Sequence, residues 1–249
     1  MKEQRRLEIE TYISQVGNAS MKELQHRFRI SMNTLRSDID FLAKAGNVTK
    51  VYGGVEYVTR HRSFDNRINL YRQEKMRISR EAASYVSDGD VIYLDYGTTT
   101  AGIVDYLSDR KNVMIITANL HVIQKCLDYP NLQLTVLPGE FNRGIYGLLA
   151  ENTKTDLSNF TIGKAFMSCC GILEDGKVCV SRFLQQKIKQ TVMLKSKDKY
   201  LITDSSKFHE VRMLNYTLLS GFNKIITDTG VDEKSRSLCG SFELEVVSV

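Results

Sequence analysis

The turn at residues 94–100, with the sequence LDYGTTT, brings together residue types that bind anions. An apolar run ends at Leu94, and Gly97 permits a tight turn into a helix. Hydroxyl groups and free amides at a helix start bind phosphate, so the turn predicts an anion site made by Thr98, Thr99 and Thr100. Asp95 would repel a phosphate, and we expect its carboxylate to bind sugar hydroxyl groups instead.

Polar residues also follow other apolar runs, where a parallel sheet would place them beside this turn. Asn119, Gly139 and Lys207 each come a few residues after such a run, and Lys207 supplies a positive charge for the anion. A simple helix cap is the alternative role for the threonines, because Thr caps helices in any fold. The shared polarity of several run ends favours the ligand site.

From residue 81 onward, short apolar runs alternate with helical patterns. The runs are continuous rather than alternating, which is typical of a parallel sheet that is covered on both faces. We expect strands at 91–94, 113–117, 133–137, 165–172, 200–203 and 224–227, and helices at 101–107, 120–127 and 184–194. This order predicts an α/β domain with a doubly wound, mostly parallel sheet.

An enzyme is one alternative, since Asp95 and Lys207 could transfer protons on a phosphorylated sugar. The carboxylates needed as a second acid or base are few around the turn, so we expect no catalytic residues. The five cysteines, Cys126, Cys169, Cys170, Cys179 and Cys239, have no spacing typical of a metal site, and a reducing compartment is implied. Cys169 and Cys170 lie in the apolar run 165–172, so we expect both to be small buried side chains. We therefore expect no metal ion and no cofactor.

The stretch at 20–39 contains the start signals of two short helices joined by a tight turn. Ser20 and Glu23 form a capping box at the first helix, and Ser31 caps the second, which we expect Gly46 to end. Apolar residues recur at helical spacing behind both caps and in a helix upstream: Leu24 and Phe28; Leu35, Ile39 and Leu42; and Ile9, Tyr12, Ile13 and Val16. The pattern predicts a three-helix core.

A hairpin pattern follows, with strands at 47–51 and 55–58 around a glycine turn. Two short helices are common in small helical domains, but a hairpin directly behind them is a wing, and the combination predicts a winged helix-turn-helix that binds double-stranded DNA. We assign to the DNA-contacting surface Ser20, Ser31, Met32, Asn33, Thr34, Arg36, Ser37, Asp40, Lys50, Tyr52, Gly53 and Gly54.

The charge distribution agrees with DNA as the partner. Residues 1–80 hold 16 Lys and Arg against 9 Asp and Glu, which gives a net charge of +7. The whole chain carries a net charge of +5, so residues 81–249 carry −2. A basic excess confined to one part of a chain is what phosphate binding requires.

Composition places the chain among globular proteins, with 42% hydrophobic and 25% charged residues in a length of 249. No apolar run approaches the length of a membrane span, and the polar residues 1–6 do not read as a secretory signal. We therefore expect a cytoplasmic protein without a membrane partner.

Several ordered motifs together resemble the DeoR family of transcription regulators over nearly the whole chain. They are residues 30–39 (ISMNTLRSDI), Gly46, Tyr52-Gly53-Gly54, Phe64, Arg67, Glu74-Lys75, residues 95–100 (DYGTTT), residues 204–208 (DSSKF) and residues 225–228 (IITD). The resemblance implies an oligomeric regulator, more often a repressor than an activator, of sugar-metabolism genes. It also implies a C-terminal domain that senses a phosphorylated sugar and is similar to ribose-5-phosphate isomerase.

The chain also departs from the family pattern. Arg36-Ser37-Asp38 stands where the family has Arg-Arg-Asp, so we expect a different operator preference. In the sensor, residues that the family keeps polar, acidic or glycine are replaced by Ala118, Pro138, Gly163, Leu173 and Gln185. We expect phosphate capture to persist at the threonine turn and Lys207, with changed or weaker recognition of the sugar body.

These observations predict three segments. Residues 1–58 form the winged helix-turn-helix, residues 59–80 a basic linker and junction, and residues 81–249 a sugar-phosphate sensor and oligomerisation domain. The predicted protein is a homo-oligomer that represses a carbohydrate-metabolism operon until a phosphorylated sugar binds. The alternatives are a DNA-binding oligomer that has lost its effector response and an enzyme similar to sugar-phosphate isomerases.

Overall fold

The computed structural model describes residues 2–44, 48–57, 64–150, 157, 160–212 and 214–249. The chain divides into two compact units, Met1–Ser63 and Phe64–Val249. The predicted helix terminator Gly46 and residues 59–63 of the predicted linker lie outside the described residues.

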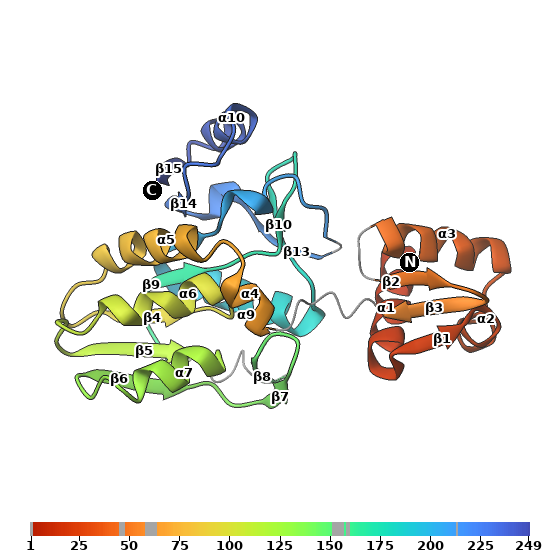
Figure 1. Cartoon of the computed structure of the whole chain (residues 1–249), viewed down its shortest axis with the longest axis horizontal. Coiled ribbons are helices and arrows are strands. Elements are labelled where there is room, and N and C mark those ends of the chain that lie inside the picture. The colour runs from red at the N-terminus through yellow and green to blue at the C-terminus, as the bar shows by residue number, and fades with distance from the viewer. Residues whose placement is uncertain (1, 45–47, 58–63, 151–156, 158–159, 213) are drawn as a thin grey trace. The chain divides into compact units, whose positions relative to one another are not determined.

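The N-terminal unit is a winged helix-turn-helix, as the sequence predicts (Figure 1). Its helices are α1 (Lys2–Val16), α2 (Met21–Phe28) and α3 (Met32–Lys44). The wing is the hairpin of β2 (Val48–Val51) and β3 (Gly54–Tyr57). A further strand, β1 (Asn18–Ser20), pairs antiparallel with β3 and makes a three-stranded sheet, which the sequence pattern does not predict.

Both predicted helix caps form. Ser20 Oγ accepts a hydrogen bond from Glu23 N at 3.1 Å, and Ser31 Oγ accepts one from Thr34 N at 3.2 Å. Arg29 ends α2 in the left-handed conformation, with a φ of 50°. Val16 was expected on the apolar face of α1 but is 45% exposed, because α1 ends there and Gly17 turns the chain into β1.

A buried carboxylate holds α1 against the recognition helix α3. Asp38 is completely buried, and it accepts hydrogen bonds from Arg5 Nε at 2.7 Å and from Arg6 Nε at 2.8 Å. Burial raises the pKa of Asp38, but the two guanidinium groups lower it more, so the net pKa lies below its usual value. Asp38 is therefore ionised and paired at neutral pH.

The C-terminal unit contains a seven-stranded sheet in which all strands are parallel, in the order β15-β14-β12-β9-β4-β5-β6. The strands are β4 (Val91–Leu94), β5 (Val113–Thr117), β6 (Leu132–Val136), β9 (Ile162–Met167), β12 (Ser196–Ile202), β14 (Lys224–Thr227) and β15 (Glu245–Ser248). The chain winds from β4 toward one edge and from β9 toward the other. The two central strands β4 and β9 therefore define the topological switch point.

Helices and smaller strands cover both faces of this sheet. One face carries α5 (Arg72–Ser84), α6 (Thr98–Gly102), the 3₁₀ helix η1 (Ile103–Tyr106) and α7 (Leu120–Cys126). The other carries α9 (Phe183–Lys195), α10 (Glu233–Ser241) and a small sheet of β10 (Gly171–Ile172), β11 (Lys177–Val180) and β13 (Leu214–Leu218). The doubly wound fold is thus confirmed.

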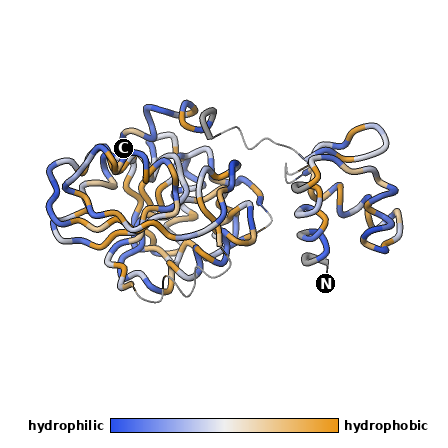
Figure 2. The backbone as a smooth tube through the Cα atoms, turned by 90° about the horizontal axis from the view of Figure 1, so that it is seen from below, coloured by the Kyte–Doolittle hydropathy of each residue, from blue (hydrophilic) through white to orange (hydrophobic). Residues whose placement is uncertain are grey.

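Alternate strand residues supply the two cores. Ile92 and Leu94 pack under α5 to α7, whereas Tyr93 between them packs on the α9 face. Hydrophobic stretches run through the middle of this unit (Figure 2). The features outside the predicted pattern include the short helix α4 (Phe64–Asn69), the hairpin of β7 (Glu140–Asn142) and β8 (Gly147–Leu149), the small-sheet strands β11 and β13, and the elements α5, α10 and β15. Residues 64–80, which the sequence analysis assigns to the junction, thus contain α4 and most of α5.

Among the described residues, no helix is both long and apolar enough to cross a membrane. The described cysteines are all free, and Cys126, Cys179 and Cys239 are buried, whereas the burial expected for Cys169 and Cys170 is incomplete. Cys169 and Cys170 are only half-buried, because their segment leaves β9 at Met167 instead of continuing as a strand.

Replacing Asp38 by Asn should destabilise the N-terminal unit by about 3–5 kcal/mol, because a buried arginine loses its partner. In the wild type, this stabilisation should be lost as the pH falls from the ordinary carboxylate pKa, near 3.9, through the lower pKa of folded Asp38. Hydrogen–deuterium exchange of α1 and α3 peptides measures both effects. The matched control is Asp40→Asn on the exposed side of α3, and equal protection in the two variants would contradict the assignment.

Candidate functional site

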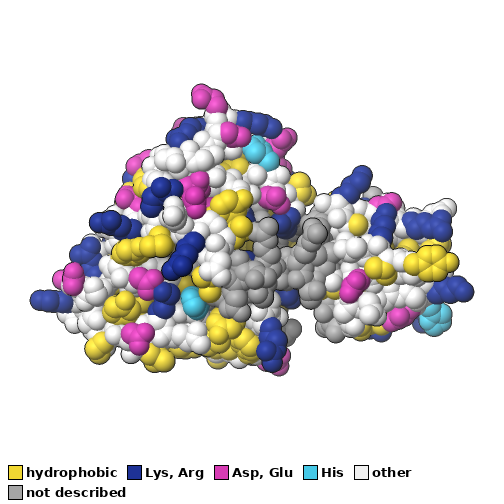
Figure 3. Space-filling view, viewed as in Figure 1, with side chains coloured by type: hydrophobic (Ala, Val, Ile, Leu, Met, Phe, Trp, Pro, Cys, Tyr) yellow, Lys and Arg dark blue, Asp and Glu magenta, His cyan; other side chains and the backbone are white. Residues whose placement is uncertain are grey.

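Most of the predicted DNA-contacting residues lie on α3 and the wing, whereas Ser20 ends β1 and Ser31 directly precedes α3. Asn33, Arg36, Ser37 and Asp40 are exposed on α3, as expected, while Met32 and Thr34 are half-buried. Lys50, Tyr52 and Gly53 are exposed on the wing. Several Lys and Arg side chains gather over α3 in the space-filling view (Figure 3).

Some of the predicted DNA-contacting residues also stabilise the fold of the N-terminal unit. Ser20 and Ser31 cap helices, and Thr34 Oγ1 lies 2.9 Å from Ser31 Oγ. A side chain at Gly54 would put its Cβ 2.6 Å from the carbonyl oxygen of Ala19, so this glycine allows β1 to pair with the wing. Arg36 and Asp40 of α3 and Lys50 and Gly53 of the wing line one hollow, and Asn33 and Ser37 line a second hollow that shares Arg36 and Asp40.

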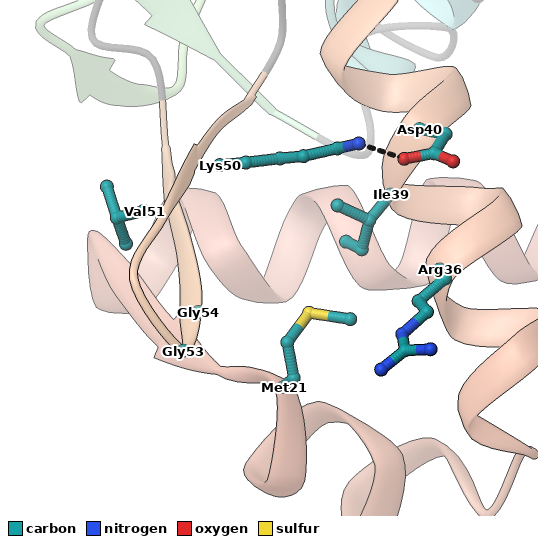
Figure 4. A pocket seen from close by; sticks show the side chains of 8 residues that line it. All are labelled: Met21, Arg36, Ile39, Asp40, Lys50, Val51, Gly53 and Gly54. Atoms are coloured by element: carbon teal, nitrogen blue, oxygen red, sulfur yellow. Dashed lines mark ion pairs between the residues drawn. The ribbon is translucent and has the colours of Figure 1, made fainter.

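A cavity of about 340 Å³ separates α3 from the wing (Figure 4). Met21 and Ile39 make apolar parts of its wall, and the Arg36 side chain projects toward it. Lys50 on β2 forms an ion pair with Asp40 on α3 across this space. On the other side of Arg36 and Asp40, an open hollow of about 580 Å³ is lined also by Arg6, Asn33 and Lys44.

In the C-terminal unit, the predicted ligand residue Asp95 is buried in an ion pair. Its carboxylate bonds Lys189 Nζ and accepts from the amide of Ser168 at 2.7 Å and its hydroxyl at 2.6 Å. Lys189 Nζ also donates to the carbonyl oxygen of Ser168 at 2.7 Å, which accepts from the Tyr216 hydroxyl at 3.0 Å. Asp95 is 1% exposed, and all of the bonds to its carboxylate go to Oδ2, whereas its Oδ1 is buried without a hydrogen-bond partner among the described residues. The carboxylate is therefore not exposed to sugar hydroxyl groups in this structure.

Sequence reasoning missed Lys189. It lies on α9, whose sequence FLQQKIKQTVMLK contains three lysines, and nothing in the local pattern marks the middle one as buried. The ion pair joins the ends of β4 and β9 to α9. It therefore fills the switch point at which sheets of this kind most often bind ligands.

The threonine turn is held together mainly by its own residues. Thr100 Oγ1 lies 2.8 Å from the carbonyl oxygens of Asp95 and Gly97, and Asn119 Nδ2 donates to the same two oxygens at 2.9 and 3.1 Å. Asn119 also caps α7, since its Oδ1 accepts from His121 N at 3.0 Å. These polar groups shape the turn and are buried within it.

Three further predicted residues, Gly97, Gly139 and Lys207, have different surroundings. A Cβ on Gly97 would lie 2.8 Å from the Ser168 side chain, so Gly97 permits close packing of the turn. Gly139 has a φ of 156°, and its Cβ would lie 2.5 Å from the Leu149 backbone. Lys207 is half-buried after β12, with Nζ 3.3 Å from Ser206 Oγ.

A cavity lies among α4, α5, α6 and α7. Of the predicted ligand residues, Thr98 is the one that lines it. This cavity has a volume of about 220 Å³, and Arg72, Lys75 and Lys125 bring three positive charges to it. One carboxylate, Asp105, faces them and binds Lys125 Nζ at 2.5 Å. A histidine and several basic side chains are visible over α6 and α7 in Figure 3.

The two helices α5 and α6 meet closely at the floor of this cavity. Ser79 Oγ donates to the carbonyl oxygen of Thr99 at 2.6 Å, and a Cβ on Gly102 would lie 2.5 Å from the same hydroxyl. Lys75 Nζ donates to the carbonyl oxygen of Arg67 on α4. The Glu74-Lys75 motif is a sequence signal for the α5 side of this cavity, but we interpreted it only as part of the junction.

Breaking the buried ion pair should unfold the C-terminal unit more readily. Lys189→Met and Asp95→Asn should each cost about 3–5 kcal/mol, because each leaves a partner unpaired in the interior. The double variant should be more stable than the sum of the two losses implies, and urea unfolding followed by far-ultraviolet circular dichroism measures all three. Strictly additive losses would show that the two groups do not interact.

Comparison with known proteins covers both units. The DeoR-like helix-turn-helix domain matches residues 5–61, and the DeoR C-terminal sensor domain matches residues 71–229. The HTH-type transcriptional regulator IolR of Bacillus subtilis is 32% identical over 99% of this chain and 99% of its own length. The glycerol-3-phosphate regulon repressor of Escherichia coli is 26% identical, covering 87% of this chain and 86% of its own.

Among solved structures, ribose 5-phosphate isomerase A from Methanocaldococcus jannaschii aligns with 56% of each chain, at 18% identity and a TM-score of 0.42. The full-length relatives named above are regulators of transcription rather than enzymes. With both domains matched in order, the chain belongs to the DeoR family of DNA-binding transcription regulators.

Proposed function

We propose that this protein represses an operon of carbohydrate metabolism and leaves its operator when a phosphorylated sugar or polyol binds the C-terminal unit. The observation that carries the proposal is the basic cavity beside the threonine turn, which is suited to a phosphate group. The name of one relative, a glycerol-3-phosphate regulon repressor, supports an effector of this class.

The proposed phosphate site is formed by Arg72, Lys75 and Thr98. An arginine binds two phosphate oxygens at once, a lysine adds a point charge, and a hydroxyl donates a third bond. The Lys125–Asp105 pair lies at the same cavity and offers a carboxylate for sugar hydroxyl groups. The volume corresponds to about seven water molecules, which suits a phosphate with a short carbon chain.

A ligand in this cavity would act on the helices that directly follow the DNA-binding unit in the chain. Six residues separate Tyr57 at the end of β3 from Phe64 at the start of α4. Lys75 ties α5 to α4 through the carbonyl oxygen of Arg67, and Arg67 donates to the carbonyl oxygen of Gly144 at 3.0 Å. A phosphate that draws Lys75 toward it competes with this tie, so effector binding would change how α4 is held.

We also propose that the protein acts as a homo-oligomer, since a recognition helix reads a two-fold operator as a pair of half-sites. Light scattering on the purified chain measures its mass directly. A monomer at the concentration that binds operator would contradict this part of the proposal.

Effector binding is tested with a panel of sugar and polyol phosphates. At least one should raise the melting temperature and release the operator, and Arg72→Ala or Lys75→Met should remove both effects by loss of phosphate contacts. Lys111→Ala, an exposed lysine outside the cavity, is the matched control. Lys207→Ala tests whether the phosphate lies at the end of β12 instead.

The outcomes separate the alternatives. A full response in the Arg72→Ala, Lys75→Met double variant would place the effector elsewhere. An operator complex that no compound in the panel changes would favour a regulator that has lost its effector response.

In this proposal, recognition of the operator sequence depends on Arg36. This residue is exposed on α3 between the two hollows of the DNA-contacting surface. Arg36→Ala should weaken operator binding by about 1–3 kcal/mol and relax sequence preference, because a bidentate base contact is lost. Footprinting and competition with non-operator DNA measure the two effects. An intact footprint would mean that α3 lies in a different register on the DNA.

A further inference from the structure

The cavity between α3 and the wing is lined by Arg36 and Asp40 on α3 and by Lys50 on β2, so it carries two positive charges and one negative charge. Lys50 extends from β2 toward α3 and forms an ion pair with Asp40, as Figure 4 shows. Both side chains remain about half exposed, at 56% for Lys50 and 51% for Asp40. The pair therefore lies on the surface that meets DNA and not in the core.

Lys50 and Asp40 are each the one residue of their charge sign in a defined set of described residues around them. Lys50 is the one Lys or Arg among the described wing residues 48–57. Asp40 is the one acidic residue among the described residues lining the two hollows of the DNA-contacting surface, which otherwise offer Arg6, Arg36 and Lys44. Asp38, two residues earlier on the same helix, is buried against Arg5 and Arg6 and does not reach this surface.

A lysine that already forms an ion pair gains little free energy from a transient contact with a DNA phosphate. Binding to DNA of any sequence is driven by cations that replace counterions on the phosphates, and each such cation steepens the dependence of affinity on salt. Lys50 paired with Asp40 is neutral as a unit, so it adds no net charge to such an encounter. To bind a phosphate, Lys50 must first leave Asp40.

We infer that Asp40 limits binding to non-operator DNA by neutralising the wing's single cation. Lys50 changes partner only when α3 docks on the operator and fixes a backbone phosphate within its reach. Asp40 is thus a specificity-determining residue that acts through Lys50. The inference adds to the DNA-binding function and does not depend on the proposed effector.

The test compares Asp40→Asn with the wild type in the full-length protein. The probes are a short duplex of mixed sequence and an operator duplex selected by the wild-type protein from a random library. On the mixed duplex, Asp40→Asn should steepen the slope of the logarithm of the association constant against the logarithm of the salt concentration by about 0.9. It should raise the affinity roughly eightfold at 0.1 M salt. On the operator the slope should stay unchanged, because Lys50 already contacts a phosphate there.

Two further variants separate this mechanism from a general loss of negative charge. Glu56→Gln removes an exposed carboxylate of β3 that lines neither hollow, and it should leave the mixed-duplex slope unchanged. Asp40→Asn combined with Lys50→Gln should return that slope to the wild-type value. Lys50→Gln alone should make the operator slope shallower by about 0.9.

Fluorescence anisotropy over a series of salt concentrations measures every slope. The inference is overturned if Asp40→Asn leaves the mixed-duplex slope unchanged, or if the steeper slope persists after Lys50 is removed. Loss of operator binding alone in Asp40→Asn would also overturn it, since Asp40 would then contact a base. A wild-type protein that binds neither duplex would instead contradict the DNA-binding function itself.

Discussion

The C-terminal unit depends on the buried ion pair of Asp95 and Lys189. It closes the junction between β4 and β9, the point at which the chain starts to wind in opposite directions. Two charges in the interior are tolerated because Ser168 supplies hydrogen bonds to both of them. The pair holds the residue at which the threonine turn starts, and the basic cavity lies beside that turn, among α4, α5, α6 and α7.

The sequence predicts six of the seven strands of the parallel sheet, all except β15, and the polarity of their ends, because continuous apolar runs and turn residues are local signals. It does not predict the direction in which a polar side chain points after the strand ends. Asp95, Thr100 and Asn119 were assigned to the ligand site on their type and place, yet their polar groups bond the turn and its neighbours. Lys75 and Arg72 reach the cavity through the packing of α5 on α6, which depends on tertiary contacts.

The same limit applies to the DNA-binding unit. Asp38 and Asp40 are two residues apart on α3, and the apolar stripe of Leu35, Ile39 and Leu42 shows which side of the helix is inward. A carboxylate on the inward side needs a partner, but only the folded unit identifies Arg5 and Arg6 on α1 as that partner. The caps at Ser20 and Ser31 were predicted correctly because a cap is defined within four residues of chain.

The pairing of β1 with β3 gives Ser20 two roles at once. It is the last residue of β1, opposite Gly54 of the wing, and the cap of α2. The hairpin is thereby joined to the helical core before any DNA is present. Its conformational entropy is lost during folding and not during recognition, so the wing meets the duplex as a preorganised surface. One residue thus fixes both where the wing hairpin joins the sheet and where α2 begins.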